Sequence, residues 1–115
     1  MSNRRVERIN ELLREEISLL IMTEVKDPRI NNIVTIVAVD TSTDLRRSTV
    51  YFSSLDNESD QGLTSTGLNS SAGFLRKKLR ERLSLRHIPE LEFQFDDSIQ
   101  TNIRLSQLID SSPAS

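Results

Sequence analysis

The sequence predicts an α+β domain in which a three-stranded sheet is covered on one face by helices. An apolar stripe with helical spacing opens the chain, two segments rich in β-branched residues follow it, and an alternating segment comes after a second helical stripe. The element order is therefore α-β-β-(α)α-β-α, with the bracketed helix as the weakest prediction. A hairpin followed by one strand that returns over a helix forms a small sheet of this kind. A chain of 115 residues is long enough for a single domain with one modest core.

The first helix is predicted from Val6 onward. Apolar residues recur there at helical spacing, and charged residues fall between them. The stripe runs through Val6, Ile9, Leu13, Ile17 and Leu20. The segment "KDPRINN" ends the helix, because Pro28 disfavours helical geometry at Asp27 and cannot continue the hydrogen-bond ladder.

Two strands are predicted next, and they form a hairpin. The segment "IVTIVAVD" (residues 33–40) is β-branched almost throughout, which predicts a strand with much of both faces buried. The segment "TSTDL" provides short polar side chains of the kind that stabilise turns. The segment "RRSTVYFSSL" then predicts a second strand, antiparallel to the first.

Residues 56–70 give the weakest pattern. Glycines and several Ser and Thr residues argue against a strong helix. Leu63, Leu68 and Phe74 nevertheless indicate that part of this region packs on the core. Whether residues 56–70 are ordered before a partner binds is left open.

The helical signal becomes clear from Gly73. Leu75, Leu79 and Leu83 form an apolar stripe among strong helix formers, and Pro89 is expected to stop the helix shortly beyond it.

The last two elements are a strand and a helix. The segment "ELEFQFD" alternates apolar and polar residues, which predicts a half-buried strand. The segment "DSIQTNIRLSQLI" is amphipathic and predicts a final helix, with Ser98 as a candidate N-cap. We expect residues 1–110 to form one domain and residues 111–115 to be a disordered tail.

The charge of the chain is unevenly distributed. Residues 69–86, "NSSAGFLRKKLRERLSLR", carry a net charge of +5, whereas the whole chain has a net charge of −2. The remainder must therefore be acidic. Such segregation is informative about partners, and the low overall charge argues against indiscriminate binding to nucleic acid. A shaped binding site fits these numbers better.

The composition excludes several classes of chemistry. The chain has no cysteine and one histidine, so disulfides, thiolate zinc sites, cysteine nucleophiles and multi-histidine metal sites are ruled out. There is no phosphate-binding glycine loop, and the acidic residues around Asp96 and Asp97 are explained as a solvated strand face. We therefore predict neither an enzyme nor a cofactor. No stretch approaches the length of a membrane span and no signal-peptide core is present, so we expect a cytoplasmic protein without a membrane partner.

Two long segments carry a resemblance to a known family. "VKDPRINNIVTIVAVDTSTDLRRSTVYFS" and "LNSSAGFLRKKLRERLSLRHIPELEFQFDDSI" resemble the ribosome-binding factor A family of bacteria and plastids, from about Arg5 to about Leu108. The strongest parts are "KDPRI", "VDTSTDL" and "LRHIPELEFQFD". The resemblance implies a KH-like fold of the second type. It also implies a monomeric, cold-shock-linked assembly factor that binds the 30S ribosomal subunit and assists 16S rRNA maturation and processing by binding, without catalysis. It leaves open whether a ribosome-associated GTPase is a further partner.

The resemblance also gives a meaning to the small residues before the basic helix. Ordinary KH domains clamp the nucleic-acid backbone with a GxxG loop between two helices. The family replaces that loop with a kink of the form Ala-x-Gly, and the aligned residues here are Ser71, Ala72 and Gly73, with serine in place of the family alanine. Small residues and Gly73 let two helices meet closely, or let the backbone of one helix approach a partner, and a helix N-terminus favours anions. The Ser71 hydroxyl could bond either a backbone carbonyl or a phosphate.

Ten residues are the candidates for contact with RNA. Helical spacing places Arg76, Lys77 and Arg80 on one flank of the basic helix, while Lys78 and Arg82 lie across its leucine stripe. The candidates are Arg4, Arg5, Arg8, Ser71, Gly73, Arg76, Lys77, Arg80, Arg86 and His87.

Each of these candidates also has a simpler explanation. A basic helix can be a solvated face that keeps a protein soluble. The arginines at the start of the first helix oppose its dipole, and they could serve solubility or pair with Glu11 instead of RNA. His87 could cap the last carbonyls of the basic helix. Arg46 and Arg47, at the start of the second predicted strand, are weaker candidates for contact with RNA than the arginines of the first helix.

Two other functions are left open by the residues. A protein–protein adaptor would use the acidic loop at residues 56–60 and the uncovered face of the sheet, and its binding would depend little on salt. A free binder of single-stranded RNA would bind short RNAs without the ribosome, which the absence of a GxxG loop disfavours.

Overall fold

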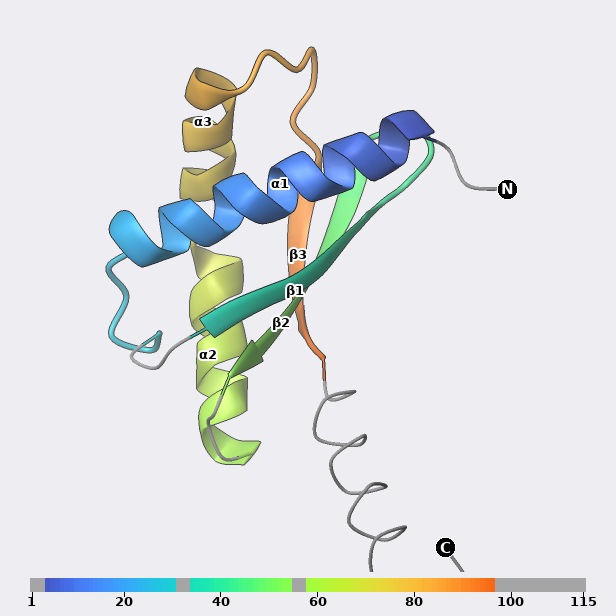
Figure 1. Ribbon diagram of the computed structural model, residues 1–115. Helices are drawn as coiled ribbons and strands as arrows, with labels where there is room; N and C mark the ends of the chain where they lie inside the picture. The colour runs from blue at the N-terminus through green and yellow to red at the C-terminus, as the bar shows by residue number, and fades with distance from the viewer. Residues whose placement is uncertain (1–3, 31–33, 55–57, 97–115) are drawn as a thin grey trace, which may run out of the picture.

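A computed structural model of the chain describes residues 4–30, 34–54 and 58–96 (Figure 1). The described elements are α1 (Arg4–Thr23), β1 (Val34–Thr41), β2 (Arg47–Ser54), α2 (Glu58–Ser70), α3 (Ala72–Arg82) and β3 (Glu90–Phe95). This order confirms the predicted α+β class. The predicted last helix and the tail at residues 111–115 lie outside the described residues.

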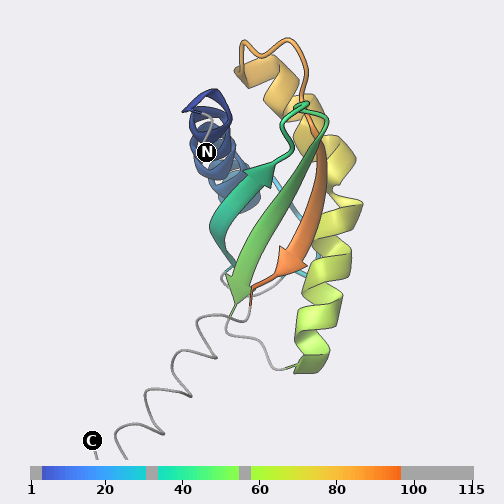
Figure 2. The ribbon, with the colours of Figure 1, turned by 90° about the vertical axis from the view of Figure 1, so that its right-hand side faces the viewer.

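The three strands form one mixed sheet in the order β1-β2-β3. β1 and β2 are antiparallel, as predicted for a hairpin, and β3 runs parallel to β2 after the return over α2 and α3. The helices lie on one side of the sheet, with α1 across β1 and with α2 and α3 along β3 (Figure 2). The opposite face of the sheet is left without a covering helix among the described residues.

The prediction that both faces of β1 are buried is wrong. Only Ile36, Val39 and Thr41 of this strand are buried. A bulge between Ile36 and Ala38 shifts the register by one residue, so that Ile36 and Val39 both pair with buried residues of β2. β1 is an edge strand covered by α1 alone, and a run of β-branched residues does not distinguish that position from a central one.

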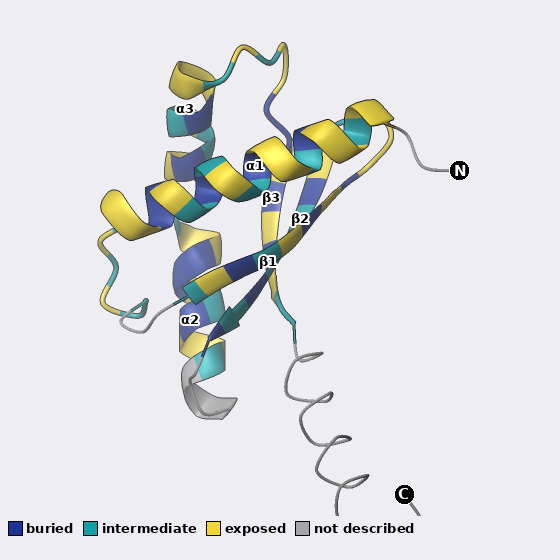
Figure 3. Ribbon diagram, in the orientation of Figure 1, coloured by how far each residue is buried: buried dark blue, intermediate teal, exposed yellow. Residues whose placement is uncertain are grey.

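The core lies between α1, the sheet and the two later helices (Figure 3). The apolar stripe of α1 faces the sheet, while the outer face of α1 carries exposed residues. Leu13 and Ile17 are fully buried, as are Val50 and Phe52 in β2. Burial of each such side chain stabilises the fold by about 1.5–3 kcal/mol before the entropy cost of ordering the chain.

α2 is a complete helix, although its residues predict one only weakly. The expectation that part of this region packs on the core is confirmed at Leu68, which is buried, whereas Leu63 is 54% exposed and Phe74 is 41% exposed. The buried side of the helix is made by Leu68 together with Thr64 and a glycine, Gly67. A helix with this composition depends on its tertiary contacts.

The segment after α1 docks on this glycine. A Cβ atom at Gly67 would lie 2.9 Å from Cγ1 of Ile30 and 3.1 Å from Cβ of Arg29. The Thr64 hydroxyl donates a hydrogen bond to the Arg29 carbonyl over 3.3 Å. α2 therefore approaches the "KDPRI" segment so closely that only glycine fits at the contact.

A local ion pair holds this segment in shape. The Asp27 carboxylate accepts hydrogen bonds from the Arg29 backbone N–H at 2.9 Å and from the Arg29 guanidinium at 2.9 and 2.7 Å. The Arg29 side chain, followed by its N–H, lowers the pKa of Asp27 from 3.8 to about 2. The bond from the Ile30 N–H to the Asp27 carbonyl closes the turn around Pro28.

We expect alanine to have opposite effects at two glycines of α2. Gly62→Ala should raise the free energy of unfolding by roughly 0.5–1 kcal/mol, because its Cβ would meet nothing within 4 Å and alanine favours the helix. Gly67→Ala should lower it, because Ile30 and Arg29 would have to move. Urea unfolding followed by circular dichroism measures both, and equal stabilisation by the two changes would contradict the close contact.

Acid should remove the contribution of Asp27. Its pKa is lowered in the folded state, so its contribution to stability is present above pH 3.8 and is lost as the pH falls toward about 2. The difference in urea midpoint between the wild type and Asp27→Asn should shrink over that interval. A difference that stays constant with pH would show that the ion pair does not stabilise the turn.

Candidate nucleic-acid interface

Three segments that are distant in the sequence meet at one end of the molecule. They are the start of α1, the turn between β1 and β2, and the loop between α3 and β3, all at the top of Figure 2. Three adjoining cavities with shared lining residues connect them. The residues with basic side chains that line these cavities are called the basic end: Arg4, Arg5, Arg8, Arg46, Arg47, Arg76, Arg86 and His87. Two acidic residues, Asp44 and Glu90, line the cavities as well.

The turn between β1 and β2 has an unusual backbone. Leu45 adopts a positive φ of 62°, in the left-handed region that non-glycine residues rarely occupy. Its N–H bonds the Ser42 carbonyl at 2.9 Å, and the Asp44 carboxylate accepts hydrogen bonds from the Ser42 hydroxyl at 2.6 Å and from the Arg46 N–H at 3.1 Å. The Ser42 hydroxyl, followed by the Arg46 N–H, lowers the pKa of Asp44. Leu45 packs on the core, which leaves Arg46 and Arg47 exposed.

Arg76 joins α3 to the loop that precedes β3. Its Nη2 donates to the carbonyl of Ile88 at 3.0 Å, and its buried Nε has no partner among the described residues. Arg76 is therefore less accessible than the two residues predicted to share its flank of the helix. Lys77 and Arg80 are exposed, whereas Arg76 is half-buried and turned toward the loop. The sequence carries no signal for a bond to a carbonyl so far along the chain.

Lys78 and Arg82, which were predicted to lie across the leucine stripe of α3, have acidic partners in and just after α1. Nε of Arg82 lies 2.6 Å from a carboxylate oxygen of Glu16, which raises the pKa of Arg82. Nζ of Lys78 lies 3.9 Å from a carboxylate oxygen of Glu24 and 5.6 Å from the centre of the Phe74 ring. These two cations have acidic partners and are not part of the basic end.

The junction between α2 and α3 is a single residue, Ser71, with φ −86° and ψ −5°. Its hydroxyl donates to the Gly67 carbonyl at 3.0 Å, which is the first of the two roles considered for it. Of the two roles expected for Gly73, close packing of two helices is wrong, because a Cβ there would meet nothing within 4 Å, and the approach of a partner to its backbone stays a prediction. The close approach is at Gly67 instead. The first hydrogen bond within α3 runs from the Leu75 N–H to the Ser71 carbonyl. The N–H groups of residues 72–74 therefore have no acceptor within the helix.

The structure separates the candidates into two groups. Ser71, Gly73, Lys77 and Arg80 lie along the α2–α3 junction and the outer flank of α3, and they do not line the three cavities. The remaining candidates belong to the basic end. Arg46 and Arg47, which the sequence favoured least for contact with RNA, also lie there.

His87 does not cap the basic helix. α3 ends at Arg82, and its C-cap residue Leu83 has an extended conformation, so the helix stops well before Pro89, which was expected to end it. His87 is exposed and lines two of the three cavities. The acidic partner considered for the first arginines, Glu11, accepts hydrogen bonds from the Arg14 guanidinium.

Two other kinds of site find no support in the described part of the chain. There, no group of three or more histidine, cysteine or acidic residues is arranged to hold a metal ion. None of the helices in the same residues is both long and apolar enough to cross a membrane.

Comparison with known proteins identifies relatives over nearly the whole chain. Residues 5–109 match the family model described as ribosome-binding factor A. A ribosome-binding factor A from Nitrosospira multiformis is 46% identical over 108 residues, which cover 94% of this chain and 85% of that protein. The crystal structure of ribosome-binding factor A from Thermus thermophilus superposes with a TM-score of 0.67 at 26% identity, covering 77% of this chain and 93% of that one.

A second structural neighbour comes from a ribosomal complex. It is a homology model of the Thermus thermophilus ribosome-binding factor A, fitted into the cryo-electron-microscopy map of a 30S complex of that protein. Its TM-score is 0.62 at 25% identity, and the alignment covers 76% of this chain and 91% of that one. These neighbours agree with the KH-like arrangement of the described elements.

We expect Arg76 to matter for stability more than its neighbour does. Arg76→Met should lower the free energy of unfolding by about 1–2 kcal/mol, because the Ile88 carbonyl would lose its donor. Lys77→Met, at the adjacent exposed position, should change it by no more than about 0.5 kcal/mol. Chemical unfolding of both variants measures the difference. Equal effects would mean that Arg76 is a surface charge, as the sequence suggested.

Proposed function

The chain belongs to the ribosome-binding factor A family, and on that basis we propose that it binds the small ribosomal subunit and assists the maturation of 16S rRNA. The observation that carries the proposal is the convergence of exposed cations from three segments at the basic end of a chain whose net charge is −2. The 30S complex of the Thermus thermophilus relative supports it.

In this proposal the binding is directed to the RNA backbone. Arginine side chains and helix N-termini bind phosphates, and such contacts position a protein without reading base sequence. The basic end would supply most of the contacts, and the α2–α3 junction with Lys77 and Arg80 would supply a second group. Two charged areas at a fixed separation recognise a folded RNA by its shape.

The proposed activity is binding, without catalysis and without a cofactor. A protein that binds one rRNA conformation more tightly than its competitors raises the population of that conformation. We propose that this single-chain factor acts in this way on immature subunits in the cytoplasm, including under cold shock, and that its release involves another factor such as a GTPase.

Charge reversal should separate the two contact areas. Arg8→Glu combined with Arg86→Glu should weaken binding to 30S subunits by about ten-fold or more at low salt, because each lost phosphate contact reduces the electrostatic attraction. Lys77→Glu with Arg80→Glu should weaken it as well. Lys26→Glu, an exposed change beyond the other end of α1, is the control.

Co-sedimentation of each purified variant with 30S and 50S subunits across a salt series measures these effects. Selective association of the wild type with 30S, with a steep salt dependence, supports the proposal. If neither pair of reversals weakens binding more than the control, the contact surface lies elsewhere. If the wild type binds no subunit at low salt, the proposed function is wrong and the protein–protein adaptor takes its place.

A further inference from the structure

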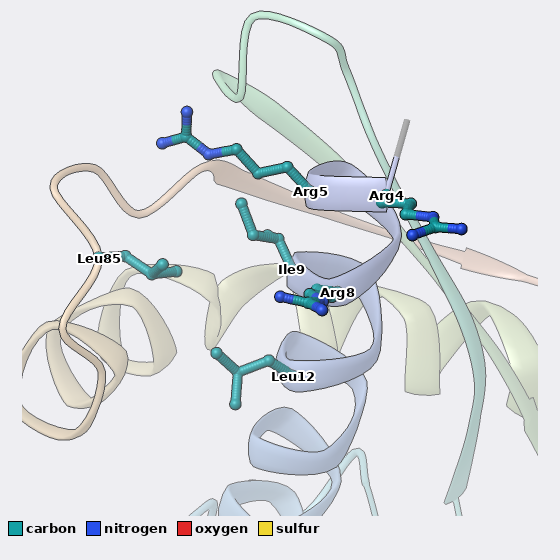
Figure 4. A pocket seen from close by; sticks show the side chains of 6 residues that line it. All are labelled: Arg4, Arg5, Arg8, Ile9, Leu12 and Leu85. Carbon is teal, nitrogen blue, oxygen red and sulfur yellow. The ribbon is translucent and has the colours of Figure 1, made fainter. Parts of the chain in front are cut away.

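The basic end contains an apolar hollow that phosphate binding alone does not require. It lies between α1 and the loop after α3, has a volume of about 470 Å³, and is within the range of roughly 300–1,000 Å³ typical of small-ligand sites. In Figure 4, Ile9, Leu12 and Leu85 point into the space between the helix and the loop, and Arg5 reaches over its upper edge. Leu12 is 36% exposed on the outer side of α1.

The hollow continues into a polar cavity. A small cavity shares Ile9 and Leu85 with the apolar hollow and shares Leu45 and His87 with a larger cavity of about 570 Å³. Arg46, Arg47 and Arg76 line that larger cavity together with two acidic residues, Asp44 and Glu90. The Asp44 carboxylate is bonded within its own turn. An apolar surface and a polar cavity with more arginines than carboxylates therefore follow one another along a continuous path.

The ligand must match both parts of this path. A bare phosphate leaves the apolar hollow in contact with water, and a purely apolar ligand makes no polar contact with Arg46 and Arg47. An unpaired nucleotide has flat, weakly polar base faces next to a phosphate, and such bases pack on apolar side chains in a pocket and stack on arginine planes. A base inside an RNA duplex is already stacked and paired, so it cannot enter.

We infer that the basic end holds an unpaired stretch of RNA. One base lies in the apolar hollow against Leu12 and Leu85, and a nearby phosphate lies in the cavity of Arg46 and Arg47, with His87 between them. This inference rests on the proposed function, since the rRNA of the subunit supplies the unpaired stretch. The number of cations along the path favours a chain with one charge per residue over an acidic peptide with a single apolar side chain.

The first test removes the apolar contact without changing the charge. Leu12→Ser and Leu85→Ser should each weaken binding to 30S subunits about ten-fold at fixed salt, because the base loses apolar contact area. The slope of log affinity against log salt should stay that of the wild type, because no phosphate contact is lost. Leu63→Ser, at a position 54% exposed in α2, is the matched control and should bind as the wild type does.

The outcomes distinguish the two proposals. If Leu12→Ser and Leu85→Ser bind as tightly as Leu63→Ser while the wild type binds 30S with steep salt dependence, the inference is overturned and the proposed function stands. If the wild type does not bind 30S, the proposed function fails and the inference fails with it. Leu12 is already solvent-accessible on a helix surface, so this variant tests the hollow even where Leu85→Ser is poorly folded.

The second test identifies the occupant. Because the chain has no cysteine, Ser84→Cys can carry one benzophenone maleimide beside Leu85, and Ser70→Cys at the exposed end of α2 is the control. Illumination of the 30S complex should attach the Ser84→Cys label to unpaired nucleotides of 16S rRNA, and the control label should not share that site. Attachment of the label to duplex RNA or to a ribosomal protein would overturn the inference. Attachment to a ribosomal protein would in addition indicate that an acidic peptide occupies the basic end.

Discussion

The packing of α1 across the sheet fixes where the residues of the basic end lie. Leu13, Ile17 and Leu20 are essentially fully buried, so the helix cannot rotate or slide without exposing apolar surface. The first turn of the helix is thereby placed next to the β1–β2 turn and the loop after α3 (Figure 2). The hydrogen bond from Arg76 to Ile88 then holds that loop against α3. Two features therefore position the site: the apolar interface of α1 with the sheet, and the hydrogen bond from the half-buried Arg76 to Ile88.

The distribution of ion pairs explains how an acidic chain has a basic end. Arg82 pairs with Glu16 and Lys78 with Glu24 where α3 crosses α1. Exposed pairs of this kind stabilise a protein by about 0–1 kcal/mol, so their main effect is on the charge pattern. They neutralise the middle of the structure, while the cations at the start of α1 lie at a helix end where positive charge is mildly unfavourable. That placement is consistent with selection for a ligand rather than for stability.

Regular periodicity made most of the fold predictable, and irregular geometry marks where prediction failed. The stripe of α1 and the alternation of β3 follow directly from residue spacing. The bulge in β1 could not be predicted, because a run of β-branched residues has the same composition with or without a bulge. α2 owes its helix to contacts made at Gly67 with a segment far away in the chain, which no local propensity reports. The candidate site was predicted from charge, and charge alone could not show that Arg76 bonds a carbonyl.

Leu45 shows how the site and the fold share one constraint. A leucine at φ 62° costs of order 1 kcal/mol, and glycine would remove that strain. The surrounding structure compensates for it, because the Leu45 side chain packs on the core and Asp44 bonds the turn on both sides. Glycine would relax the backbone but leave the junction between the apolar hollow and the polar cavity without one wall. The strain is therefore retained where a rigid turn sets the direction of two arginines, and preorganised cations lose less freedom when they bind an anion.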